Sequence, residues 1–359
     1  MTNPKLIFII IMFILVVFML FINNYDQPEQ IHIEKIHIEK IPTEEIHIEK
    51  YTNKEIDIVI TWVDNTEEFK KERDIWLKND IYQKPSEPRY SQYEELKYLL
   101  RSIEKHFPNY NKIYLVVKDG QFPSYLKRDN PNLQVVNHSE IIPKENLPTF
   151  NSRAIEMYLH HIPNLTENYL YANDDIIITK DLSKSYYFDQ NEVPYVYLTN
   201  IQINNNETNI DKLTHISNAF MCGLNFNSLI LDEITKKENR FEVPHHWMIY
   251  NKSFDNQIEK YFKNYFYNHN KNNAFDTTGA SKFRRCDDLY LVSLIKPYLY
   301  KNWFNAETKK VNSVIINNYN NLVEIDAPFI CLEDITDNNF DKFTKFMTHL
   351  FPEKSSFEI

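Results

Sequence analysis

Short apolar runs alternate with amphipathic stretches through the part of the chain that follows residue 55. The runs have the length and composition of buried strands, and they cover residues 56–63, 112–117, 133–136 and 168–173. Amphipathic helices are expected between them, at residues 92–106 and 152–162, each ending before a proline. This order of elements predicts an α/β fold with an open, mostly parallel sheet of Rossmann-like type, which binds ligands at the carboxyl ends of its strands.

Acidic residues follow the predicted strands. Asp64 and Asp119 each come just after a strand, and the last strand ends in Asn173-Asp174-Asp175. Alternation along this strand places Asn173 and Asp175 on one face, so their oxygen atoms can reach one hard cation such as Mg2+ or Mn2+. The alternative is an Asx-rich turn that caps the strand, and the turn by itself leaves both interpretations open.

Glycine content and charge exclude several classes of protein. The chain has only three glycines in 359 residues, so neither a Walker loop nor a GxGxxG turn can wrap a phosphate in backbone N–H groups. A phosphate ligand must therefore be held by side chains and a cation, an arrangement that suits the diphosphate of a nucleotide sugar. The net charge of −10 argues against binding to nucleic acid through its phosphates, and no nucleic-acid partner is expected.

The second half of the chain supplies a histidine pair and an arginine pair. After Tyr197 the sequence becomes richer in Asn, Lys and aromatic residues, and a mainly helical region folded onto the sheet is expected. The pair His245-His246 offers an imidazole that can take a proton from an acceptor hydroxyl near neutral pH. Arg284 can present a fork of donors to phosphoryl oxygens. The alternatives are a surface pair of histidines and a solvated helix start.

The N-terminal region has the pattern of a membrane anchor and a spacer. Residues 6–22 are apolar without interruption, nearly long enough to cross a bilayer as a helix, and no small-residue cleavage site follows. The sequence IHIEK then occurs three times and is interpreted as a stalk, with metal binding by its histidines as the alternative. A single-pass membrane protein with a lumenal or extracytoplasmic catalytic domain is therefore expected. Its parts are a tail (1–5), an anchor (6–22), a stalk (23–53) and a catalytic domain (54–359).

The three cysteines, Cys222, Cys286 and Cys331, lie far apart and show no CxxC spacing. This arrangement indicates neither a zinc site nor a dense disulfide framework. A single bridge that leaves one thiol unpaired stays open.

Taken together, these segments resemble the Stealth family of sugar-phosphate transferases, which includes capsular polysaccharide phosphotransferases and the lysosomal-enzyme N-acetylglucosamine-1-phosphotransferase. The resemblance reaches from residue 56 to the end of the chain. The first segment is IDIVITWVD from Ile56, and the second runs from Arg89 through EELKYLLRSI and LPTFNS to YANDD. The third consists of the pairs Pro244-His245 and Phe283-Arg284. The fourth is FICLED with Phe351-Pro352 and Ser356-Phe357-Glu358. The resemblance implies an open sheet of GT-A-like type. It also implies transfer of a hexose 1-phosphate from a nucleotide diphosphate sugar to a hydroxyl of a glycan or polysaccharide, with release of a nucleoside monophosphate.

The resemblance implies roles for individual residues. The catalytic set comprises His245, which would activate the acceptor hydroxyl, Arg284, which would steady the phosphoryl group, and Asp175. The metal ligands for Mg2+ or Mn2+ would be Asn173, Asp175 and Asp334, and the substrate-binding residues Asp57, Asp64, Arg101, Asn151 and Ser152. Two departures from the family pattern stand out: Asn65 follows Asp64 where glycine is common, and His246 fits the histidine position as well as His245 does.

Two other functions fit the same residues. A metal-dependent glycosyltransferase of GT-A type would use a similar acidic turn but would break the bond between the sugar carbon and the phosphate oxygen. A catalytically inert, membrane-anchored surface module would keep the fold without turnover. The sequence leaves open which sugar nucleotide and acceptor are used and whether the chain forms an oligomer.

Overall fold

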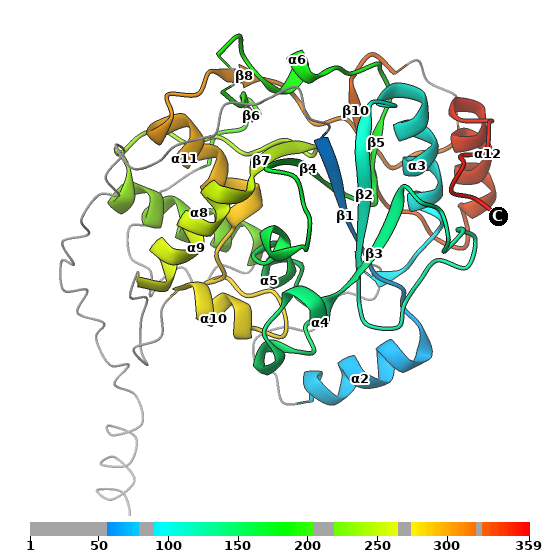
Figure 1. The fold of residues 1–359 in the computed structure, drawn as a ribbon, viewed down its shortest axis with the longest axis horizontal. Helices are drawn as coiled ribbons and strands as arrows, with labels where there is room; N and C mark the ends of the chain where they lie inside the picture. The colour runs from blue at the N-terminus through cyan, green and yellow to red at the C-terminus, as the bar shows by residue number, and fades with distance from the viewer. Residues whose placement is uncertain (1–55, 79–89, 192, 204–218, 265–273, 321–324) are drawn as a thin grey trace, which may run out of the picture.

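A computed structural model describes residues 56–78, 90–191, 193–203, 219–264, 274–320 and 325–359. Its central feature is a five-stranded sheet in the order β3-β2-β1-β4-β7 (Figure 1). The strands are β1 (Ile56–Trp62), β2 (Tyr110–Val117), β3 (Leu133–Asn137), β4 (Asn168–Asn173) and β7 (Met248–Asn251). Neighbouring strands are parallel except β7, which pairs antiparallel with β4. The predicted open, mostly parallel sheet is confirmed.

The strand order places a topological switch point between β1 and β4. β2 and β3 lie on one side of β1, whereas β4, the next strand of the sheet along the chain, lies on its other side. In open α/β sheets, ligands bind in the crevice at the carboxyl ends of such strands. Thr61 pairs with Asn173, so β1 and β4 end at the same edge of the sheet.

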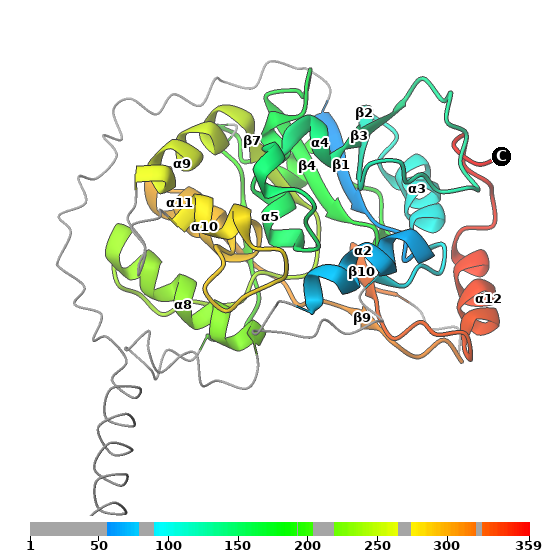
Figure 2. The ribbon, with the colours of Figure 1, turned by 90° about the horizontal axis from the view of Figure 1, so that it is seen from below.

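Helices cover both faces of this sheet. Along β4, Tyr169 and Tyr171 belong to one apolar cluster and Leu170 and Ala172 to the other, because successive side chains point to opposite faces. The first face is covered by α5 (Ser152–Glu156), α8 (Ala219–Ile234), α9 (Lys252–Asn264), α10 (Ala274–Ala280) and α11 (Lys296–Trp303). The second is covered by α3 (Glu95–His106) and α12 (Phe340–Leu350), as Figures 1 and 2 show.

Shorter elements complete the chain. The strands β5 (Ile176–Ile178), β10 (Phe329–Leu332) and β9 (Ile315–Ile316) form a second sheet, and β6 (Val196–Leu198) pairs with β8 (Thr308–Lys310). The remaining helical elements are α2 (Glu67–Leu77), α4 (His138–Ile141), η3 (Lys144–Asn146), η4 (Leu159–His161), α6 (Lys184–Tyr187) and η5 (Leu291–Ile295). The expected mainly helical second half is confirmed among the described residues, since α8 to α12 hold most of its regular structure. Its strands are too short to show a periodic pattern, and they form by pairing with distant segments.

The expectations for the N-terminal region lie outside the described residues. This applies to the tail (1–5), the anchor (6–22) and the stalk (23–53). Within the part of the chain that the structure describes, no helix combines the length and the apolar character needed to cross a bilayer. The expected single-pass membrane localisation is corrected to this extent: the described residues show no membrane anchor.

A disulfide joins Cys222 of α8 to Cys286, and Cys331 is left as a buried free thiol. The structure thus selects the one-bridge arrangement that the sequence left open. The bridge fixes α8 to the segment that carries Arg284, two residues before Cys286.

Candidate active site

The acidic turn lies where β4 leaves the main sheet. β4 ends at Asn173, Asp174 and Asp175 form the turn, and β5 then pairs with β10 in the second sheet. The backbone carbonyl of Asp175 accepts a hydrogen bond of 2.9 Å from the N–H of Leu332. Asp64 follows β1 at the same edge, where the Gln121 side chain bonds to its backbone N–H and carbonyl. The fold therefore brings Asp64 and Asp174-Asp175 to the switch point.

The carboxyl groups of Glu95, Asp174 and Asp175 gather at this turn with little positive charge to compensate them. Burial raises the pKa of Glu95 to about 7, and the nearby charge of Asp174 adds to the rise. Burial also raises the pKa of Asp174 and that of Asp175, and the latter is raised further by Asp174 and Glu95. Asp174 accepts a hydrogen bond of 2.9 Å from Gln92. The buried Oδ1 of Asp175 has no hydrogen-bond partner among the described residues.

This acidic group fits a divalent cation. Carboxyl groups that raise each other's pKa lack positive charge nearby, and a bound Mg2+ or Mn2+ would supply it. The unpartnered oxygen of Asp175 is a donor of the kind that such hard cations prefer. The residues present therefore suit the expected cofactor.

Cys331 connects Asp175 to His245. Its Sγ lies 3.9 Å from Oδ2 of Asp175 and 3.7 Å from Nδ1 of His245. The ligand atoms of His245, Cys331 and Glu333 all lie within 4.8 Å of one another, so this group could also take part in holding an ion. The structure thus brings the predicted His245 and Asp175 together, through a cysteine that sequence reasoning assigned no role.

The neighbouring His246 has a different environment. Its ring is buried, stacks on Phe329 at 5.1 Å between centroids, and places Nδ1 2.6 Å from the carbonyl oxygen of Trp247. Burial lowers the pKa of His246 to about 4. His245, in contrast, is exposed beside the acidic turn. Of the two histidines, only His245 has both solvent access and a contact with the site.

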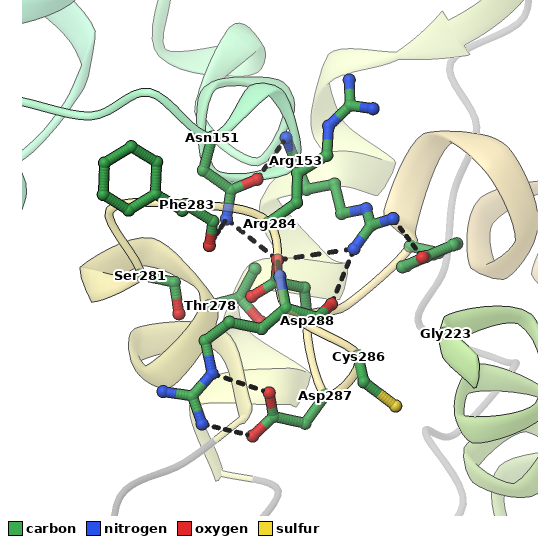
Figure 3. Close-up of polar contacts among 12 residues, drawn as sticks. Asn151, Arg153, Gly223, Thr278, Ser281, Phe283, Arg284, Cys286, Asp287 and Asp288 are labelled. Atoms are coloured by element: carbon green, nitrogen blue, oxygen red, sulfur yellow. Dashed lines mark hydrogen bonds and ion pairs between the residues drawn. The ribbon is translucent and has the colours of Figure 1, made fainter. Parts of the chain in front are cut away.

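Arg284 lies beside the start of α5. Its Nε donates a hydrogen bond of 3.0 Å to Oγ of Ser152. Asn151 caps α5 by accepting a bond from the N–H of Arg153, and its amide also donates to a carboxylate oxygen of Asp288 at 2.9 Å. Figure 3 shows the contacts of Asn151, with the side chain of Arg284 directed away from Asp287 and Asp288. Asn151 therefore holds the arginine segment in place, whereas Ser152 contacts the guanidinium itself.

Glu156 links Arg284 to the end of β4. Burial raises the pKa of Glu156, and the positive charges of Arg284 and Arg153 offset part of that rise. The hydroxyl of Tyr171 lies 3.3 Å from Glu156 and donates a bond of 2.8 Å to Oδ1 of Asn173. The arginine and the acidic turn are thus joined through a chain of buried polar groups. Asn173 faces this chain, on the opposite side of β4 from Leu170 and Ala172.

Three predicted site residues, Asp57, Arg101 and Asp334, do not join this group. Asp57 lies at the amino end of β1, where Asn111 and the N–H of Thr166 bond to its carboxylate at 2.8 and 2.7 Å. Arg101 forms a two-bond ion pair with Glu358, at 2.7 Å for each bond. The substrate-binding roles expected for Asp57 and Arg101 are corrected accordingly, since both side chains are engaged in holding the fold.

Asp334 is displaced from the acidic turn by the backbone. It adopts a left-handed conformation with φ 56° just after β10 and is exposed. The carboxylate that acts on the pKa of Asp175 is instead Glu333. The structure therefore brings Glu333, and not the predicted Asp334, into the surroundings of Asp175.

Sequence reasoning also missed Glu95 and Glu156, although a signal exists for Glu95. In the amphipathic helix α3, Glu95 precedes Leu99 by four residues and so shares its buried face. Glutamate is rarely buried, so a carboxylate on the apolar face of a helix marks that residue as a candidate for a functional role.

Comparisons with known proteins match this chain to a described family and to several relatives. Residues 89–196 match the model of Stealth protein CR2, conserved region 2. The chain is 38% identical over 149 residues to the capsular polysaccharide phosphotransferase LcbA of Neisseria meningitidis, covering 40% of each protein. It is 31% identical to the capsular polysaccharide phosphotransferase fcs1 of Haemophilus influenzae, covering 68% of this chain and 64% of that one. It is 27% identical to the exopolysaccharide phosphotransferase cps2G of Lactiplantibacillus plantarum, covering 85% and 96%.

The chain belongs to the Stealth family. It spans less than two thirds of the length of the first two of these relatives. Among solved structures, an active-site mutant of LgtC superposes with a TM-score of 0.37 and 11% identity, over 82% of this chain and 96% of that one. A superposition at this score carries no conclusion about function.

Proposed function

We propose that the chain is a sugar-phosphate transferase. It moves a hexose 1-phosphate from a nucleotide diphosphate sugar to a hydroxyl of a polysaccharide or glycan, and it releases a nucleoside monophosphate. The observation that carries this proposal is the meeting of His245 and Asp175 on either side of Cys331 at the switch point of the sheet. The relatives named as polysaccharide phosphotransferases support the same reaction class.

His245 acts as the general base. Its Nδ1 lies against Cys331, which leaves Nε2 to take the proton of the acceptor hydroxyl. The acceptor oxygen then attacks the β-phosphorus of the donor, and the bond from that phosphorus to the bridging oxygen breaks. The nucleoside monophosphate leaves with the bridging oxygen, and the hexose phosphate becomes a phosphodiester.

Arg284 stabilises the phosphoryl group during transfer. Its guanidinium offers several donors in a fixed plane, and the bond to Ser152 holds that plane in position. Asp175, with Glu333, would hold Mg2+ or Mn2+, which when bound would neutralise the donor diphosphate. Asp64 belongs at the same edge as a donor-binding residue.

A donor labelled in the β-phosphate tests this proposal against the glycosyltransferase alternative. A phosphotransferase places the label in the acceptor and releases unlabelled nucleoside monophosphate. A glycosyltransferase leaves the label in a released nucleoside diphosphate, and that outcome would refute the proposal.

The inert-module alternative requires a second comparison. Donor turnover and cation-dependent donor binding are measured for the parent chain and for Asp175→Asn. Turnover in the parent that is lost in the variant supports the proposal. A parent that neither turns over nor binds any nucleotide sugar in the presence of Mg2+ or Mn2+ contradicts it.

A further inference from the structure

Two histidines and a glutamate converge at a place remote from the acidic turn. Nε2 of His160 lies 2.7 Å, and Nε2 of His161 lies 2.8 Å, from the same Oε2 atom of Glu259. The histidines belong to η4, which leads into the amino end of β4, and Glu259 belongs to α9. α9 leaves β7 beside that same end, because Asn251 pairs with Asn168. The acidic turn lies at the opposite, carboxyl end of β4.

The hydrogen bonds of His161 define its protonation. Nδ1 of His161 lies 3.2 Å from the carbonyl oxygen of Ile141. A carbonyl oxygen only accepts, so Nδ1 carries a proton. Nε2 must then either carry a second proton, which it donates to Glu259, or bind a metal ion. A ring whose outer N–H donates to a backbone carbonyl is the usual arrangement of a metal-ligating histidine.

The donor set and its spacing suit a transition metal. Two imidazole nitrogens and one carboxylate oxygen are the ligands of many zinc sites with an open fourth position. Ligand atoms about 2 Å from a tetrahedral ion are about 3.3 Å apart, so the observed separations need to widen by only about 0.5 Å. All three ligand atoms lie within 4.8 Å of one another. Glu259 and His160 are buried, whereas the side chain of His161 is 33% exposed, which gives an ion a route of entry.

We propose that His160, His161 and Glu259 form a binding site for a divalent ion of the zinc class, which joins η4 to α9. The site is separate from the acidic turn, and the inference does not depend on the proposed transferase activity. Histidine nitrogens disfavour Mg2+, so the two sites take different ions.

Binding at this site releases protons in a defined number. Without the ion, the Nε2 atoms of His160 and His161 both donate to Glu259. When the ion binds, the imidazolium of His161 loses one proton, and the Nε2 proton of His160 moves to its Nδ1, which is buried without a partner among the described residues. Net release of about one proton per ion is expected. Lys263, 2.6 Å from Oε1 of Glu259, keeps its bond because the ion uses Oε2.

The test uses the full chain with the stalk histidines His32, His37 and His47 changed to Ala, so that they cannot contribute. After treatment with a chelator, the protein is titrated with Zn2+ by calorimetry in two buffers of different ionisation enthalpy, and with Co2+ by visible absorption. One equivalent of Zn2+, about one released proton and the visible bands of low-coordinate Co2+ are expected. His161→Ala and Glu259→Gln should each weaken binding by at least about tenfold.

Matched controls assign the ion to its ligands. His349→Ala removes an exposed histidine of α12, and His245→Ala removes the histidine of the proposed active site. His349→Ala should leave Zn2+ affinity unchanged, and His245→Ala should leave unchanged the equivalent of Zn2+ whose binding depends on His161 and Glu259. Failure to bind one equivalent, equal affinity in His161→Ala and the background protein, or loss of binding only in His245→Ala would each overturn the proposal. Because Glu259 is buried, thermal unfolding without metal is measured to check that Glu259→Gln folds. His161 is partly exposed, so His161→Ala should disturb folding less.

Discussion

At the scale of single residues, the partners of a carboxylate decide between a structural and a functional role. Asp57 lies in β1 and Asp175 follows β4, and the sequence marked both as site candidates. Asp57 receives bonds from Asn111 and from the backbone of Thr166. Asp175 has a buried oxygen without a partner in the described part of the chain, and its neighbours are acids. Of these two carboxylates, only that of Asp175 has an oxygen available to bind a ligand.

The adjacent histidines give the sharpest test at this scale. His245→Ala should lower transfer by about 10²- to 10⁴-fold, the usual loss when a general base is removed, with little change in thermal stability because the ring is exposed. His246→Ala should instead lower the unfolding temperature, because it removes a buried ring that packs on Phe329. Turnover and thermal unfolding are measured for both variants. Full activity in His245→Ala would show that another group takes the proton.

The adjacent arginines provide a second matched pair. Arg284→Ala should reduce turnover by about 10²- to 10³-fold, because it removes charge-stabilising donors from the transferring group. Arg285→Ala should have a much smaller effect, since that side chain forms an ion pair of 2.8 Å with Asp287. Single-turnover rates at saturating donor measure the difference. Equal losses in both variants would contradict the role proposed for Arg284.

At the scale of elements, the sequence predicts what depends on local pattern. The amphipathic helix α3 is found within the range predicted for it, whereas the helix predicted for residues 152–162 is found as two shorter elements, α5 and η4. Strands β5, β9 and β10 have between two and four residues each and exist through pairing with one another. A carboxylate on β10 or just after it reaches Asp175 only through that pairing. For this reason the sequence could not show which of Glu333 and Asp334 lies near Asp175. The left-handed backbone conformation of Asp334 separates the two side chains.

The ion pair between Arg101 of α3 and Glu358 should hold the C-terminal segment. Burial alone would raise the pKa of Glu358, but the bonds from Arg101 outweigh burial, and the pKa is lowered. A lowered pKa stabilises the fold above the ordinary glutamate range, and this contribution disappears as the pH falls through the folded-state value. Glu358→Gln should cost about 3 kcal/mol at pH 7, because it leaves Arg101 buried and unpaired.

Urea unfolding at several pH values measures this contribution. The difference between the parent and Glu358→Gln should be constant near neutrality and should shrink below about pH 4. Glu353→Gln, at an exposed position in the same segment, is the control and should change stability by less than about 0.5 kcal/mol. A difference that persists undiminished in acid would rule out the ion pair as its source.

The disulfide between α8 and the arginine segment should also stabilise the fold. It closes a loop with a sequence separation of 64 residues, for which the chain-entropy model gives about 4 kcal/mol. Replacing both Cys222 and Cys286 by Ser should lower the unfolding free energy by up to this amount. Cys331→Ser is the control for loss of a thiol without a bridge. Identical stability of the parent in oxidising and reducing buffer would show that the bridge contributes nothing.

At the scale of the whole molecule, β4 serves two layers at once. Tyr171 and Asn173 face the helical layer that contains Glu156 and Arg284, whereas Leu170 and Ala172 face the layer built on α3 and β10. The turn that follows then brings Asp174 and Asp175 to Glu95 and Cys331. Arginine and acids therefore reach one edge of the sheet from opposite faces.

Removal of divalent cations should separate the two ion sites of the molecule. Chelation should abolish donor binding while the circular dichroism spectrum is retained, because two apolar clusters hold the fold on either side of the sheet. Adding Mg2+ should restore donor binding alone, since a hard cation prefers the carboxylate oxygens around Asp175. Adding Zn2+ should raise the unfolding temperature through His160, His161 and Glu259, because a ligand bound only by the folded state stabilises it.

Calorimetric titration with nucleotide diphosphate sugars and thermal unfolding report the two effects independently. Glu259→Gln should lose the zinc-dependent rise in unfolding temperature but keep Mg2+-dependent donor binding. Asp175→Asn should show the reverse, because its carboxylate belongs to the other end of β4. If chelation left donor binding intact, the cation assigned to the acidic turn would be wrong. Loss of both effects in either single variant would mean that the two ends of β4 are coupled and do not act as separate sites.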